Sequence, residues 1–218
     1  TREILFIRKS DNHTKVWEGE KLSKNQANEL SGIDSIYFID DFKDILSSIA
    51  SQVDTFYINK NEHYRANSPV ETREDRFISW LLKKYPAHNV AKSNPILQRQ
   101  RSIKHPDEID QIKKACDITR KGFNRVLKFI KPDVWEYEIE AEFIHEFIKS
   151  SSKGFAYSPI IASGNDNNVL HYIKNNKQCK SGELILMDVG AEYGNYSSDM
   201  TRTVPVSGIF SKRQKEIY

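Results

Sequence analysis

The stretch GELILMDVGAEYGNYSSDMTRTVPVSG, residues 182–208, decides the fold of the second half of this chain. It opens with an apolar run, Leu184 to Met187, which is too short for a helix and is bounded by glycines. Such a run predicts a strand that is buried on both faces. A second run, rich in Thr, Val and Tyr, extends from about residue 196 to 206. Because Tyr193-Gly194-Asn195 between the runs has turn composition, we predict an antiparallel hairpin.

Two aspartates of this stretch are candidate metal ligands. If the hairpin turns between residues 193 and 194, Asp188 and Asp199 are equidistant from the turn and face each other, with Cβ atoms roughly 5 Å apart. Two carboxylates so close in apolar strands repel each other unless a cation lies between them. A single Asp near a strand end is more often a turn former or helix cap. The residues alone leave both interpretations open, and the pairing favours a metal site.

The segment DVGAEYGNYSSDMTRTVPVSG, with LHY seventeen positions before its first aspartate, resembles the pita-bread metallopeptidases. Within that family it is most similar to the Xaa-Pro aminopeptidases (aminopeptidase P), with prolidases as the nearest relatives. The resemblance continues back through IIASGNDNNVLHYIKNN and, more weakly, RQRSIKHPDEIDQIKKACDIT, and covers roughly residues 98–218. It implies an α/β N-terminal domain of the creatinase-like type, residues 1–96. The first half of an α+β pita-bread domain with a curved antiparallel sheet would follow, residues 97–218.

The resemblance also implies a site. Asp188 and Asp199 would be the first two of five protein ligands of two divalent ions, usually Mn²⁺ in this family. His171 would not bind metal but would face the substrate, where it could hydrogen-bond the scissile carbonyl or pass a proton. The local pattern alone favours a core histidine bonded to backbone groups, and the resemblance favours the substrate-facing role. Arg202 would form a salt bridge that orients a neighbouring carboxylate.

The activity implied is removal of the N-terminal residue from peptides with proline in second position. In that reaction, hydroxide activated by two metal ions attacks the peptide carbonyl. Prolidase activity on Xaa-Pro dipeptides is the alternative, as is a metal-free pita-bread module that binds peptides or proteins. Creatinase and methionine aminopeptidase are other enzymes on the same fold, and the sequence TRTVPVSG and the α/β N-terminal domain disfavour methionine aminopeptidase. A homodimer or higher homo-oligomer is expected, because the unpaired strand edge and apolar patches of a truncated sheet favour self-association.

Compared with the family, sequence is expected to be missing at both ends. The remaining ligands of the family, one histidine and two glutamates, would follow the last residue, Tyr218. The expectation is therefore a fragment that is inactive by itself and holds metal partially or not at all.

Composition narrows the class of protein. Hydrophobic residues make up 38% and charged residues 29% of the 218 residues, which is ordinary for a globular protein. The net charge of +3 does not indicate a nucleic-acid partner. No apolar run is long enough to predict a membrane span, and the start lacks the pattern of a signal peptide. Cys116, on the apolar face of a predicted helix, and Cys179 are predicted to be free thiols in a reducing, cytoplasmic setting.

The N-terminal region predicts alternating strands and helices. Strands are expected at 4–7, 35–39 and 55–58, with a return strand at Val16-Trp17, and helices at 41–51 and 72–85. Trp17, His63, Tyr64 and Trp80 are interpreted as packing or surface residues. Ser93-Asn94-Pro95 is expected to be a turn leading into the second domain.

Two amphipathic helices are predicted before the hairpin. The first begins at Pro106 and ends before Pro132, and the second is opened by a capping pair, Asp133 and Glu136. A strand is expected at 155–162, followed by a loop at Ser163-Gly164-Asn165-Asp166.

Overall fold

The computed structural model describes residues 2–60 and 68–218, and it divides into two compact units, Thr1–Ser102 and Ile103–Tyr218. The division lies a few residues after the junction predicted at 96/97. His63 and Tyr64 lie outside the described residues.

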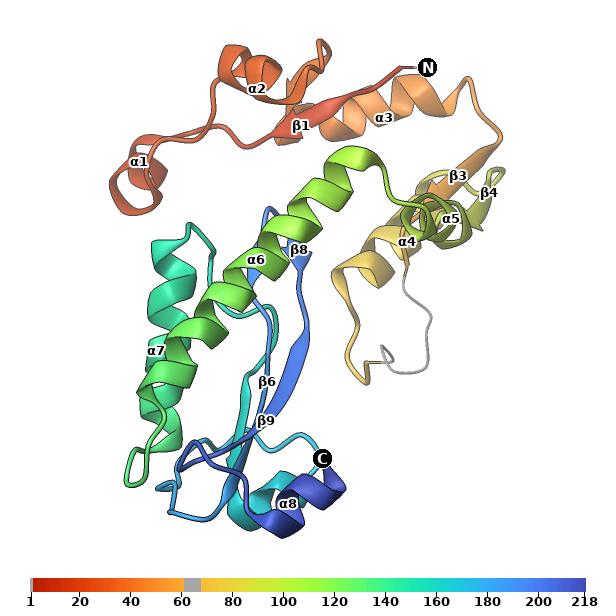
Figure 1. Cartoon of the computed structure of the whole chain (residues 1–218). Helices are drawn as coiled ribbons and strands as arrows, with labels where there is room; N and C mark the ends of the chain where they lie inside the picture. Colours follow the sequence, from red (N-terminus) through yellow and green to blue (C-terminus); the bar gives the residue numbers. More distant parts are fainter. Residues whose placement is uncertain (1, 61–67) are drawn as a thin grey trace. The chain divides into compact units, whose positions relative to one another are not determined.

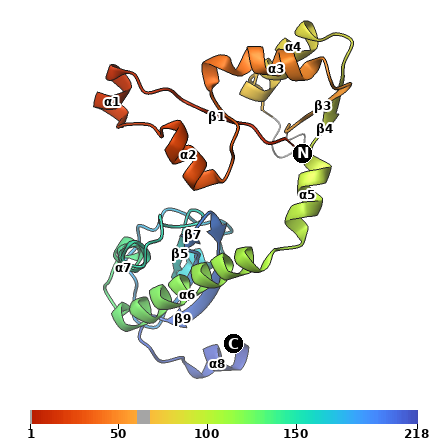
Figure 2. The same ribbon diagram turned by 90° about the horizontal axis from the view of Figure 1, so that it is seen from above.

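The first unit alternates strands and helices, which confirms an α/β N-terminal domain (Figure 2). Its strands form two parallel pairs, β1 with β2 and β3 with β4. In chain order the elements are β1 (Leu5–Ile7), α1 (Asn12–Glu18), α2 (Lys24–Ser31), β2 (Ile36–Phe38), η1 (Ile39–Asp41), α3 (Phe42–Ala50), β3 (Thr55–Ile58), α4 (Arg73–Lys84), β4 (Asn89–Lys92) and α5 (Asn94–Ser102).

Two local predictions for this unit are wrong. The return strand at Val16-Trp17 is part of helix α1, because Asp11 caps that helix by accepting a hydrogen bond from the Thr14 N–H at 2.6 Å. The turn predicted at Ser93-Asn94-Pro95 is the start of α5. Proline is tolerated there because the first N–H groups of a helix have no partner within the helix.

The second unit consists of two long helices and an antiparallel sheet, as predicted (Figure 1). The sheet has the strand order β5-β6-β9, and a short hairpin, β7-β8, extends beyond it. The elements are α6 (Pro106–Phe129), α7 (Glu136–Lys149), β5 (Ile160–Ser163), η3 (Gly164–Asn168), β6 (Leu184–Val189), β7 (Glu192–Tyr193), β8 (Tyr196–Ser197), β9 (Met200–Pro205) and α8 (Lys212–Ile217).

Helices α6 and α7 approach each other closely at Gly122. A Cβ atom there would lie 2.8 Å from Phe147 and 2.9 Å from Phe143, so only glycine fits without a shift of these rings. Thr119, Phe123 and Val126 of the predicted apolar stripe are buried, but Cys116 is exposed. The prediction that Cys116 faces the core is wrong because the buried stripe of α6 passes through the neighbouring positions Ala115 and Ile118.

Strand β6 has one buried face, not two as predicted. Its side chains alternate: Ile185, Met187 and Val189 are fully buried in the core shared with α6 and α7. Leu184, Leu186 and Asp188 lie on the opposite face and are half-buried. Alternation with a period of two is the pattern of a sheet that is covered on one side. The candidate ligand Asp188 therefore belongs to the face that helices α6 and α7 leave open.

None of the described helices is both long enough and apolar enough to cross a membrane.

Candidate metal centre

The hairpin turn lies one position later than predicted. Gly194 (φ 58°) and Asn195 (φ 66°) both adopt the left-handed conformation that a two-residue hairpin turn of type I′ requires. Tyr193 pairs with Tyr196 across the turn, and further back Asp188 pairs with Thr201. The prediction that Asp188 directly faces Asp199 is therefore wrong. The residue opposite Asp188 is Thr201, two positions after Asp199. Because every second side chain of a strand points to the same face, Asp199 stays on the face of Asp188.

The hydroxyl of Tyr157 brings the two aspartates together. It lies 2.6 Å from Asp188 Oδ1 and 2.9 Å from Asp199 Oδ1, so these two carboxylate oxygens are at most 5.5 Å apart, the sum of the two distances. The expected proximity of the carboxylates is thus confirmed, although they are diagonal rather than opposed. Burial, followed by the hydrogen bonds to Asp188 and Asp199, raises the pKa of Tyr157 well above its usual value. The phenol keeps its proton and acts as a donor to the pair.

The positions of the two carboxylates also depend on a close approach between the backbone at Gly190 and the backbone at Ser198. A Cβ atom on Gly190 would lie 1.8 Å from the carbonyl oxygen of Ser198, which no side chain can tolerate. At this crossing the Ala191 N–H donates to Thr119 Oγ1 at 2.9 Å and to Ser198 Oγ at 3.0 Å. The Thr119 and Ser198 hydroxyls are 2.7 Å apart and buried. Helix α6 therefore fixes the chain between Asp188 and Asp199.

The tip of the hairpin is attached to the same helix. The Tyr196 hydroxyl donates to Glu108 Oε1 at 2.7 Å, and Lys114 Nζ lies 5.4 Å from the centre of the Tyr193 ring. Hydrogen bonds from the His105 backbone and then from Tyr196 lower the pKa of Glu108, so this carboxylate is a stable acceptor. Both ends of the hairpin are thus held by α6.

The donor set fits part of a divalent-cation site. Carboxylate oxygens are preferred ligands of hard cations, and the two that meet here lie on the open face of the sheet. Tyr157 presents a hydroxyl proton between them, where a cation would balance their charge. Residues 2–60 and 68–218 contain no group of three or more His, Cys, Asp or Glu side chains that could hold a metal ion.

His171 lies on a loop rather than in the core. It is exposed, has a φ of 55°, and follows η3 within the segment that returns along the edge of β5. It has no hydrogen bond or ion pair to any described residue. The structure does not bring it into contact with Asp188 or Asp199, and its role in substrate binding stays a prediction.

Arg202 is not brought to the carboxylates. In the ladder it pairs with Met187, so its side chain starts from the face opposite to Asp188. Its guanidinium Nη1 donates to the Thr201 carbonyl at 2.7 Å, and within the described ranges it forms no ion pair. The predicted salt bridge to a neighbouring carboxylate is therefore absent from this structure. The contact with the two aspartates comes instead from Tyr157, which the sequence analysis missed because it lies more than thirty positions before Asp188.

Comparison with known proteins places this arrangement in the class of metal-dependent peptidases. Residues 110–218 match the model of metallopeptidase family M24, and residues 1–57 match the N-terminal domain of aminopeptidase P. Since the first match covers half of the chain, the chain belongs to metallopeptidase family M24.

The relatives that this chain matches are named as Xaa-Pro aminopeptidases or aminopeptidases P. The Xaa-Pro aminopeptidase of Haemophilus influenzae is 30% identical over 100% of this chain and 48% of its own length. The solved structure of a candidate aminopeptidase P from Bacillus anthracis has a TM-score of 0.93 at 35% identity, covering 100% of this chain and 52% of that one. A variant of Escherichia coli aminopeptidase P in complex with substrate has a TM-score of 0.87 at 29% identity over 99% of this chain and 49% of that one. The chain spans about half the length of the relatives it matches.

Proposed function

We propose that the whole protein to which this chain belongs is a metal-dependent aminopeptidase that removes the N-terminal residue from peptides with proline in second position. The observation that carries the proposal is the carboxylate pair: Asp188 and Asp199 share one hydroxyl on the open face of the sheet. This pair lies within the part of the chain that matches family M24. The names of the relatives support the choice of an Xaa-Pro aminopeptidase.

Asp188 and Asp199 would hold two divalent ions, which supply a hydroxide nucleophile at neutral pH when bound. A histidine and two glutamates outside this chain would complete the site. The protein groups described here have separate tasks. Tyr157 holds the two carboxylates at one place, and Thr119 and Ser198 fix the backbone between them. His171 would donate a hydrogen bond to the scissile carbonyl or pass a proton.

Manganese is the proposed metal, because oxygen-rich sites suit hard cations. A homodimer or higher homo-oligomer and a cytoplasmic location stay predictions. The 218-residue chain alone is expected to be inactive. Two carboxylates replace few of the water ligands of an ion, so it should hold metal weakly.

The proposal is tested by peptide cleavage with the whole protein, loaded with Mn²⁺. Release of the first residue from an Xaa-Pro-Xaa tripeptide, with little cleavage of an Xaa-Ala-Xaa control, is the expected result. Cleavage restricted to Xaa-Pro dipeptides would assign prolidase activity instead. Tight peptide binding with no cleavage in any metal would show a binding module and contradict the proposal.

A further inference from the structure

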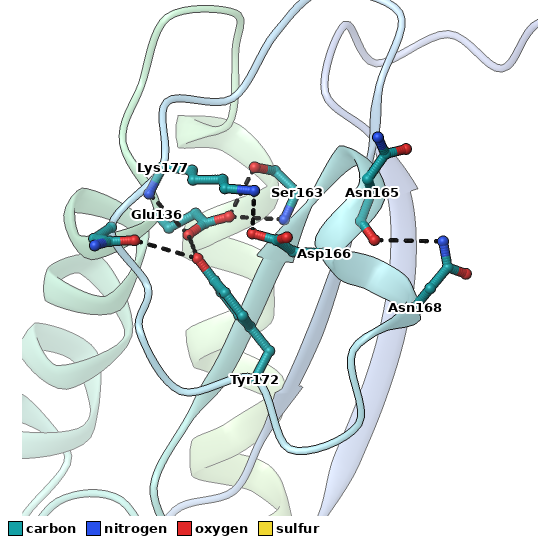
Figure 3. A network of polar contacts seen from close by, with 8 residues as sticks. Glu136, Ser163, Asn165, Asp166, Asn168, Tyr172 and Lys177 are labelled. Carbon is teal, nitrogen blue, oxygen red and sulfur yellow. Dashed lines mark hydrogen bonds and ion pairs between the residues drawn. The ribbon is translucent and has the colours of Figure 1, made fainter.

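A fully buried carboxylate, Glu136, lies at the start of helix α7 (Figure 3). Its Oε1 accepts hydrogen bonds from the Ser163 N–H at 2.8 Å and the Ser163 hydroxyl at 2.7 Å. Its Oε2 accepts from the Tyr172 hydroxyl at 2.8 Å and the Lys177 N–H at 3.0 Å. Four donors satisfy a group whose burial would otherwise be costly.

This environment corrects one sequence prediction. Glu136 was expected to cap α7 in a pair with Asp133, but Asp133 has a φ of 73° and its N–H donates to the Cys179 carbonyl. The capping role belongs to Glu138, whose Oε2 accepts from the Trp135 N–H at 2.7 Å. Glu136 is therefore free to point into the second unit and contact the segment that follows β5. As the first residue of α7, it also lies where the helix dipole favours negative charge.

The partners of Glu136 lie at three points of one loop. Ser163, the last residue of β5, begins the loop, Tyr172 directly follows His171, and Lys177 lies at the end of the loop. One buried carboxylate therefore connects the beginning, the middle and the end of residues 163–177, which we call the His171 loop. Burial, then the hydrogen bond to Glu136, raises the pKa of Tyr172, so its hydroxyl keeps the proton that it donates.

Other contacts hold the ends of the His171 loop without Glu136. Asn167 continues the ladder of β6 by donating to the Leu184 carbonyl and accepting from the Leu186 N–H, both at 3.0 Å. The buried Asn175 accepts from the Ile161 N–H at 3.0 Å and donates to Glu140 Oε2 at 2.9 Å. Between these anchors, the described contacts attach the side chain next to His171 through the Tyr172 hydroxyl, to Glu136 at 2.8 Å and to Asn176 Oδ1 at 3.4 Å.

We propose that Glu136 is a positioning residue for His171 and acts through Tyr172. The left-handed backbone of His171 is an unfavourable conformation for a residue other than glycine. The hydrogen bond on the adjacent residue holds the chain in that conformation and so determines where the imidazole is directed. The expected effect on catalysis rests on the proposed role of His171. The claim that Glu136 and Tyr172 orient the His171 side chain does not depend on that role.

The matched variants are Tyr172→Phe and Tyr137→Phe. Both changes remove only a hydroxyl at or beside the first turn of α7. Tyr137, however, is half exposed as a residue, and its hydroxyl has no hydrogen bond to the described residues. The readout is the imidazole Cε1–H signal of His171 in NMR spectra of the 218-residue chain, assigned with a His171→Gln variant. We expect the signal to shift or broaden in Tyr172→Phe and to stay unchanged in Tyr137→Phe.

Glu136→Gln is the second variant. A Gln amide offers an NH₂ group where a carboxylate offers an acceptor, so it cannot satisfy both pairs of donors. The His171 signal should change in the same direction as in Tyr172→Phe, and the signal of His145 on the exposed part of α7 should not. An unchanged His171 signal in folded Tyr172→Phe would overturn the positioning role, even if Glu136→Gln fails to fold.

Kinetics of the whole protein separate positioning from function. Tyr172→Phe should lower kcat about tenfold, within the 10²-fold that a misplacement of about 1 Å can cause. KM and metal content should change little, thermal stability should fall modestly because Glu136 loses one donor, and Tyr137→Phe should match the wild type. If the His171 signal moves but kcat does not fall, and His171→Ala also has normal turnover, the positioning holds and the proposed role of His171 is wrong. If His171→Ala is inactive and Tyr172→Phe is fully active, the positioning proposal is wrong.

Discussion

The hairpin that carries Asp188 and Asp199 and the loop that carries His171 are held in different ways. The register of the hairpin is determined by neighbours in sequence, through a left-handed two-residue turn, alternating strands and a glycine at the crossing, and helix α6 then holds it in place. The loop contains the short 3₁₀ turn η3 and is otherwise held by polar side chains, Asn167 and Asn175 near its ends and Glu136, which lies 27 residues before Ser163 and 41 before Lys177. Local rules therefore explain the strand pairing that places Asp188 and Asp199 on one face of the sheet, whereas the loop has no such pairing and depends on polar contacts with distant residues. The predictions below test this contrast.

Gly190→Ala should have the largest effect. Its Cβ would overlap the Ser198 carbonyl, a backbone group that cannot rotate away, so the hairpin must open. We expect a loss of unfolding free energy above about 4 kcal/mol, measured by denaturant unfolding of the 218-residue chain. Gly208→Ala is the control, because that position has a φ of 77° but nothing within 4 Å, and should lose only about 1–2 kcal/mol. Equal losses would show that the crossing is not what fixes the hairpin.

Tyr157→Phe tests whether the phenol stands in for a cation. Without metal, the variant leaves two adjacent carboxylates without their shared donor and should lose about 1–3 kcal/mol of stability. Excess Mn²⁺ should restore part of this loss, since a cation between the carboxylates replaces the missing hydrogen bonds. Thermal melting of wild type and variant with and without Mn²⁺ measures the difference. A melting temperature of the variant that does not respond to Mn²⁺ would argue against a cation at this place.

High pH should weaken the second unit through Cys179. Burial raises the pKa of this fully buried thiol to about 11. The stability linked to its protonation is complete below the ordinary thiol value of about 8.5 and is lost as pH rises through 11. We expect about 2 kcal/mol less stability at pH 10 than at pH 7 from this group, because pH 10 lies about 1.5 units above the unfolded pKa and still below the folded one. Cys179→Ala should remove that part of the pH dependence, whereas Cys116→Ala, at an exposed thiol, should preserve it.

Thr119→Val should have the smallest effect, and a local one. The change removes the hydroxyl that accepts from the Ala191 N–H but keeps the shape of the side chain, and Ser198 Oγ still accepts from the same N–H. Hydrogen exchange of the Ala191 amide should become faster, while amides in η3 and the His171 loop should be unaffected. Thr119→Ser, which keeps the hydroxyl, should exchange as the wild type does. Equal exchange in all three proteins would show that α6 does not hold the crossing.

Much of the fold could be predicted from the sequence, because its signals are local. Pro106 with Asp107 marks the start of α6, and the apolar run from Leu184 predicts β6. The register of the hairpin was wrong by one position at the turn, because Tyr193, Gly194 and Asn195 all have turn character and only the backbone shows which two form the turn.

The supporting groups of the site could not be predicted in the same way. Tyr157, Thr119 and Glu136 lie far from their partners in sequence, and each resembles an ordinary residue of a loop or helix. Arg202 was expected to orient a neighbouring carboxylate, but the period of the strand directs it to the other face. A polar contact across the fold has no sequence pattern of its own, which is why the glutamate at the start of α7 was mistaken for a cap.

The most direct test of the central claim is metal analysis of the whole protein after dialysis, comparing wild type with Asp188→Asn and Asp199→Asn. An amide keeps the shape of the side chain but removes the charge that a divalent ion requires. We predict that the wild type retains bound metal and that each variant loses most of it, with His171→Ala retaining the wild-type content. Full metal content in both aspartate variants would contradict the account, because the carboxylate pair beneath Tyr157 would then not be the metal site.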